Sequence, residues 1–65
     1  MARFSKSLIR HIKLAVAYSL NVGHKVDYYH VREIADFASG QELDAIQLDI
    51  LTDMVIADLK IEVAS

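Results

Sequence analysis

The chain of 65 residues contains no cysteine, no proline and no tryptophan, and only two glycines. Without cysteine, neither a disulfide nor a thiolate metal site can stabilise the fold, and this composition is compatible with a reducing, cytoplasmic location, which we expect. Gly23 and Gly40 are isolated, so the sequence has no glycine-rich loop of the kind that binds phosphate. Gly23 is predicted to end the first helix, and Gly40 lies in a turn of small residues between the second and third helices.

Long hydrophobic runs are also missing. No stretch of about 18 uncharged apolar residues occurs, so the sequence predicts no membrane span. Yet 54% of the residues are hydrophobic, and a domain of this size buries only roughly 60% of the surface that its unfolded chain exposes. The surplus of apolar surface predicts that a second chain covers part of it, and we expect a homodimer.

Each part of the chain lacks charge of one sign. The first 26 residues contain five bases and no acid, whereas the remaining residues contain nine acids and two bases. This segregation favours head-to-tail contacts between copies, or a charged partner for either part. The basic start also has the composition of a transit peptide or a membrane-surface helix, but its removal would leave too few residues for a stable domain.

Apolar residues recur at helical spacing and predict a single all-α domain over 1–65, with helices at about 5–21, 28–38 and 40–63. Ser5 and Asp27 are suitable N-caps for the first two helices. The second helix is expected to turn Phe37 inward, and a short strand over 26–31 is a competing interpretation. Ser39 followed by Glu42 forms a capping-box pattern that is expected to open the third helix.

This third helix would contain some 24 residues and be about 36 Å long, against about 16 Å for the second helix. It would therefore project past its neighbour. Two apolar stripes follow it, roughly 120° apart, and one of them would have to meet another subunit. The predicted dimer interface consists of Leu48, Leu51, Val55 and Leu59.

Acidic residues separate the two stripes. Glu42, Asp49 and Asp53 follow one edge, where neighbouring like charges reduce helix stability, and the only base on this helix is Lys60. We therefore predict that Glu42, Asp49 and Asp53 bind an external partner, because complementary charge gives fast and selective encounter.

The charges also oppose the helix dipoles. Lys6 and Arg10 lie in the first turns of their helix, and Asp58 and Glu62 lie in the last turns of theirs. In an up-down-up bundle the first and third helices run parallel, so these charges would not meet within one chain. An antiparallel contact between subunits is one way to bring them together; charges that simply remain in water are the other.

Catalytic and metal-binding patterns are weak. No serine, threonine or histidine lies in a nucleophile elbow or beside a base at a recognisable spacing. His30 and Glu33 could ligate a metal together, but one such pair supplies too few ligands. We expect no enzyme activity, no cofactor and no metal.

Nucleic-acid binding is a stronger alternative. Residues 31–40 resemble the first helix and turn of a helix-turn-helix motif, but the following helix is acidic and would be repelled by phosphates. The predicted contacts lie on the first helix instead: they are Arg3, Lys6, Arg10 and Lys13.

The sequence as a whole predicts a small non-catalytic regulator or inhibitor, a homodimer that binds another protein. Its size would suit a regulator encoded by a bacterium or a phage. The alternatives are a nucleic-acid-binding regulator that uses the basic first helix, and a structural subunit that assembles with copies of itself.

Overall fold

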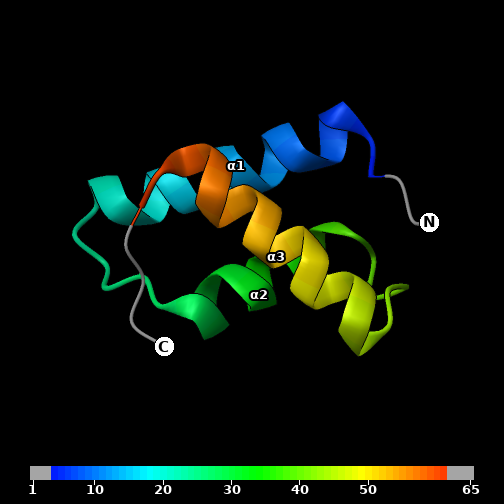
Figure 1. The fold of residues 1–65 in the computed structure, drawn as a ribbon. Coiled ribbons are helices and arrows are strands. Elements are labelled where there is room, and N and C mark those ends of the chain that lie inside the picture. Colours follow the sequence, from blue (N-terminus) through cyan, green and yellow to red (C-terminus); the bar gives the residue numbers. More distant parts are fainter. Residues whose placement is uncertain (1–3, 62–65) are drawn as a thin grey trace.

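Three helices contain most of the residues that the structure describes. The computed structural model of the protein describes residues 4–61, and no strand occurs among them. The helices are α1 (Lys6–Asn21), α2 (Tyr28–Ala38) and α3 (Ala45–Leu59). Figure 1 shows α3 lying diagonally across α1 and α2, and it contacts both. The predicted all-α class with three helices is confirmed, and the strand alternative is wrong.

The first two helices begin at the predicted caps. The Ser5 hydroxyl accepts a hydrogen bond from the backbone N–H of Leu8 at 3.0 Å, and the Asp27 carboxylate accepts one from the N–H of His30 at 2.8 Å. Each bond satisfies a donor of the first turn that has no partner within the helix. At the end of α1, Gly23 adopts a φ of 84°, which glycine tolerates without a steric penalty.

The boundary between α2 and α3 differs from the prediction. Ser39 does not open α3; it ends α2, where its hydroxyl donates to the backbone carbonyl of Asp36 at 2.8 Å. Gly40 follows with a φ of 75°, a left-handed conformation that closes a helix. The cap of α3 is Asp44, whose carboxylate accepts from the N–H of Gln47 at 2.8 Å.

The third helix is consequently shorter than predicted. It has 15 residues and ends at Leu59, where Lys60 takes the left-handed conformation; Val63, the predicted end, lies outside the described residues. At 1.5 Å per residue α3 is about 22 Å long, similar to the 16-residue α1. The expected long projection beyond the other helices is therefore wrong.

The core lies where the three helices meet. Each helix contributes apolar side chains that are almost or completely inaccessible to solvent. The one buried polar side chain among the described residues is Thr52, whose hydroxyl donates to the carbonyl of Leu48 at 2.7 Å and so loses no hydrogen bond. The apolar core residues are Ile12, Val16, Val31, Ala35, Leu48, Leu51 and Val55.

Candidate functional site

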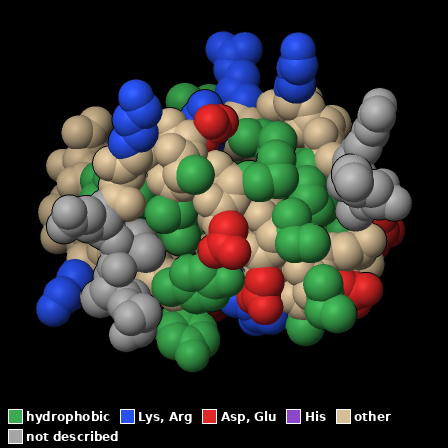
Figure 2. All heavy atoms as spheres, viewed as in Figure 1, with side chains coloured by type: hydrophobic (Ala, Val, Ile, Leu, Met, Phe, Trp, Pro, Cys, Tyr) green, Lys and Arg blue, Asp and Glu red, His purple; other side chains and the backbone are tan. Residues whose placement is uncertain are grey.

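The outer face of α3 carries a row of exposed apolar side chains. Ile46, Ile50 and Met54 are 73%, 48% and 42% exposed, and their spacing of four residues aligns them along one side of the helix. We call these three residues the outer stripe. Figure 2, drawn from the same side as Figure 1, shows hydrophobic side chains gathered over α3 with acidic side chains between them. Contiguous exposed apolar surface of this kind is typical of interaction sites.

The structure reverses the two stripes that the sequence predicts. The sequence pattern assigns Leu48, Leu51 and Val55 to a dimer interface, but they are buried within the single chain, and Leu59 packs half-buried against the same core. Leu48, Leu51 and Val55 are therefore not accessible to a second chain, and Leu59 is only partly accessible. The reason is that α3 is apolar on two sides, and the sequence alone does not say which side meets α1 and α2.

The acidic edge is partly neutralised within the chain. Arg32 Nε donates to Asp49 Oδ1 at 2.8 Å, and the Tyr28 hydroxyl donates to the same oxygen at 3.2 Å. The hydrogen bond from Arg32 lowers the pKa of Asp49, and the bond from Tyr28 lowers it further. Partial desolvation raises the pKa of the Tyr28 phenol, and the charges of Asp53 and Asp49 add to the increase. The negative charge of Asp49 is therefore neutralised by a base of the same chain, Arg32, and needs no external base.

We expect this contact to make stability depend on pH. Because the pKa of Asp49 is lowered in the folded state, its stabilising effect is present above the ordinary aspartate pKa and is lost as the pH falls through the lowered value. Asp49→Asn should therefore flatten the loss of stability on acidification. Urea unfolding at pH 7 and at pH 3 measures the effect, which is small because both groups are exposed. Asp53→Asn is the matched control, and an equal flattening in both variants would contradict the assignment.

The other predicted acidic contacts occupy different places. Asp53 is exposed on α3, one turn beyond Asp49, and forms no ion pair with the residues in the range 4–61. Glu42 is exposed in the connection between α2 and α3 rather than on the helix. The predicted set is therefore not one continuous helical edge, and Asp53 borders the outer stripe most directly.

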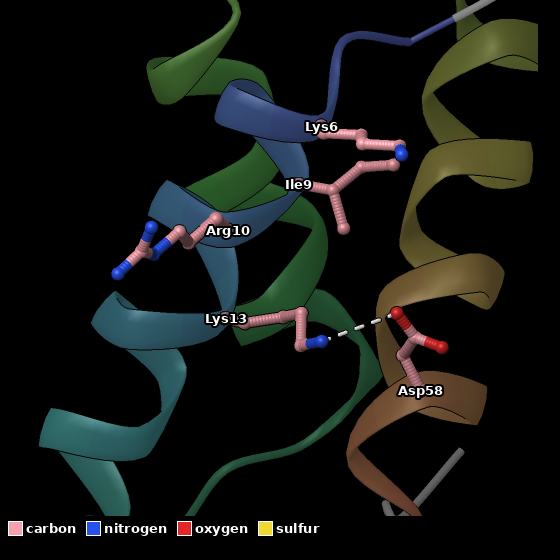
Figure 3. Close-up of a pocket in the computed structure, with 5 residues that line it drawn as sticks. All are labelled: Lys6, Ile9, Arg10, Lys13 and Asp58. Carbon is pink, nitrogen blue, oxygen red and sulfur yellow. Dashed lines mark hydrogen bonds and ion pairs between the residues drawn. The ribbon is translucent and has the colours of Figure 1, made fainter.

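The bases of α1 line an open hollow of about 450 Å³ between α1 and the end of α3. Figure 3 shows Lys6 and Lys13 extending toward α3 while Arg10 points away from it. Lys13 Nζ lies 3.2 Å from Asp58 Oδ2, so a base of α1 forms an ion pair with an acid in the last turn of α3 of the same chain. This contact needs no second subunit, but its base is Lys13, in the middle of α1. Lys6 and Arg10, which are expected not to meet the acids of the third helix within one chain, form no ion pair among the described residues. Arg3 lies outside the described residues.

A second exposed apolar position is Phe37 on α2. The prediction that it faces inward is wrong, since its side chain is 78% exposed, and Ala35 is the α2 residue that enters the core in its place. A hollow of about 310 Å³ beside the Phe37 ring is also lined by His30, Glu33 and Ile34. Phe37 thus provides a solvent-exposed aromatic ring away from the outer stripe.

Histidine and carboxylate groups do not converge on a common centre. His30 Nε2 lies 3.3 Å from the Ser19 hydroxyl, which itself donates to the Ala15 carbonyl at 3.2 Å. Across residues 4–61 no group of three or more His, Cys, Asp or Glu side chains could hold a metal ion.

Comparison of the chain with protein-family models, curated proteins and solved structures gives no match. None of the helices within residues 4–61 has both the length and the apolar character that crossing a membrane requires. Residues 4–61 thus present an apolar surface on α3 that is bordered by acidic side chains, and a basic surface on α1.

Proposed function

We propose that this protein is a small non-catalytic regulator or inhibitor that works by binding protein chains, including a second copy of itself. The observation that carries the proposal is the outer stripe on α3. Three large apolar side chains remain in solvent on a helix whose opposite side already fills the core. Burying a side chain of this type is worth about 1.5–3 kcal/mol, so a partner that covers the stripe gains substantial binding free energy.

The acidic residues beside the outer stripe favour a protein partner whose surface is basic or of mixed charge. Asp53 borders the outer stripe without an ion pair among the described residues, whereas Asp49 is already engaged by Arg32. Of the three predicted acids, Asp53 and the exposed Glu42 are therefore the ones that remain available to an external base. Acids at the rim of an apolar contact mainly accelerate encounter and exclude wrong partners.

The test is removal of the stripe without disturbance of the core. The double variant Ile46→Ser, Ile50→Ser is expected to keep its helicity and to lose both self-association and binding to other proteins. Sedimentation equilibrium measures the mass, which we expect to be about twice 7.3 kDa for the wild type at micromolar concentration and that of a monomer for the variant. Circular dichroism checks the fold.

Phe37→Ser is the matched control, because it removes an exposed apolar side chain elsewhere. A wild-type protein that is monomeric and captures partners no better than the stripe variant would contradict the proposal. Equal losses in the stripe variant and in the Phe37 variant would show that general surface hydrophobicity, rather than the stripe, drives association.

A nucleic-acid-binding regulator is the second candidate. It is favoured by α1, which presents Lys6, Arg10 and Lys13 and contains no acid. The ion pair between Lys13 and Asp58 argues against it. A base that is already neutralised within the protein displaces no counterion from a phosphate when nucleic acid binds. Sub-micromolar binding to DNA or RNA at about 150 mM salt, with a salt slope reduced by Lys6→Ala and Arg10→Ala, would favour this candidate.

The third candidate is a structural subunit for which self-association is the whole function. The same outer stripe supports it. Mass measurements separate it from a regulator, because a structural subunit forms a series of larger species with increasing concentration, whereas a regulator of this kind forms one discrete dimer.

A further inference from the structure

The outer side of α1 complements the outer side of α3. Arg10, Leu14 and Tyr18 follow one another at intervals of four residues, and all three are exposed. Lys6, one turn before Arg10, is also exposed but extends toward α3 of its own chain (Figure 3), so it is not part of this row. We call Arg10, Leu14 and Tyr18 the outer face of α1. It combines an apolar part with a basic part, whereas α3 combines the outer stripe with the acid Asp53.

We propose that the occupant of the outer stripe is the outer face of α1 from a second copy of this chain. This inference rests on the self-association in the proposed function and names the two surfaces that meet. In the contact, Leu14 and Tyr18 cover the outer stripe, and Arg10 approaches Asp53. The chain itself thus supplies both the acidic apolar surface and its basic apolar counterpart.

The dimensions of the two surfaces agree. Both consist of rows with a spacing of four residues, and rows of this kind interdigitate in the commonest class of helix packing. The helices have 16 and 15 residues, or about 24 and 22 Å at 1.5 Å per residue. Helices that pack through such rows cross at about 50°, so the two surfaces meet around the middle of each helix, where Leu14 and Ile50 lie.

The helix dipole gives an independent reason for this occupant. Lys6 is the first residue of α1, and no acid lies in the first turn. A base at this position is unfavourable, because the N-terminus of a helix carries partial positive charge. A neighbouring carboxylate removes the conflict. Within the chain Asp58 pairs with Lys13, and neither Lys6 nor Arg10 forms an ion pair among residues 4–61. Arg10, which points away from its own α3 (Figure 3), is available to an acid from another copy.

Each copy presents one surface of each kind. Two copies can therefore make the contact twice in a closed pair, or many copies can make it once each in an open array. In both cases every contact joins unlike surfaces. A contact between two outer stripes would instead join two helices that contain acids and no base within Ala45–Leu59, so no charge attraction would favour it.

Charge reversal tests the proposal directly. Asp53→Lys and Arg10→Glu should each weaken self-association by about fivefold or more in low salt, the effect of about 1 kcal/mol of lost charge attraction. An equimolar mixture of the two variants should associate again, because every contact between unlike variants pairs opposite charges. The chain carrying both changes should also associate with itself.

Two controls change the same charges elsewhere. Lys25→Glu lies in the connection between α1 and α2, and Glu33→Lys lies on the exposed side of α2; neither should alter the association constant. Circular dichroism of each variant verifies that the helices remain formed. If either control weakens association as much as its counterpart, net charge rather than contact is responsible and the proposal is overturned.

The outcomes distinguish this inference from the proposed function. A wild type that associates through the outer stripe, with no weakening by either reversal or no recovery in the mixture, means that another surface covers the stripe; the inference then fails and the proposed function remains. A monomeric wild type whose outer stripe binds a different protein overturns both the inference and the self-association in the proposed function, and leaves only the binding of other proteins in place. Loss in each variant with recovery in the mixture supports the contact between α1 and α3.

Discussion

Replacement of Leu51 by aspartate is expected to abolish the folded state. Leu51 is 0% exposed and belongs to the cluster in which all three helices meet. An aspartate there loses the apolar burial of the leucine and places an unpaired charge in the core, a combination that costs more than several kcal/mol. Small domains have only marginal stability, so the variant should show neither cooperative thermal unfolding nor native helicity by circular dichroism.

The adjacent residue provides the control. Ile50 lies next to Leu51 in the sequence but points outward in the outer stripe. Ile50→Asp should keep the helical fold and affect association alone. A Leu51→Asp protein that remains helical and merely becomes monomeric would mean that Leu51 faces another subunit, as the sequence by itself predicts, and that α3 is rotated about its axis relative to the structure.

A second large effect is expected at Ile12. Its side chain is completely buried in the core beneath α2 and α3, and truncation to alanine leaves a cavity there. Ile12→Ala should lower the free energy of unfolding by about 2–5 kcal/mol. In a chain of this size such a loss leaves a substantial unfolded fraction at room temperature, and urea titration followed by circular dichroism measures it.

Leu14→Ala is the matched truncation on the same helix. Leu14 is exposed, and an exposed substitution of this kind changes stability by about 0.5 kcal/mol or less. Both variants are measured at a protein concentration at which the chain is monomeric, because Leu14 also lies in the proposed contact between copies and association would add to its apparent stability. Under these conditions the difference between the two variants should be large. Similar losses in both would indicate that α1 does not pack against the other helices through the face that contains Ile12.

The local signals in the sequence are sufficient where short-range chemistry decides. Ser5 and Asp27 cap their helices because a side-chain oxygen satisfies the first orphan N–H groups within three residues, and Gly23 ends α1 because it tolerates a positive φ. The predicted ranges for the first two helices therefore agree with the structure to within one residue at each end.

Competition between local signals explains the error at α3. Ser39 with Glu42 and Asp44 with Gln47 both have the spacing of a capping box. Only the second caps a helix in the structure, because Gly40 closes α2 and the N–H of Gln41 donates a hydrogen bond to the carbonyl of Asp36 at 3.0 Å. A glycine immediately after Ser39 is the signal against a helix start, because it is the preferred residue one position beyond a helix end.

The candidate site depends on information that the sequence does not contain. Periodicity identifies two apolar stripes on α3, but the structure reverses their assignment to core and surface. Likewise, Asp49 on α3 is neutralised by Arg32 on α2, 17 positions earlier in the chain. No spacing rule along one helix predicts such a pair.

The sequence by itself determined the number of helices, the caps of the first two, and the separation of basic from acidic residues, because these follow from contacts within a few positions and from composition. Only the tertiary structure decided which side of α3 is inside, which acids are paired and which apolar residues remain exposed. The physical reason is that α3 is apolar on two sides, so its orientation is set by how its side chains fit those of α1 and α2, a property of three helices together.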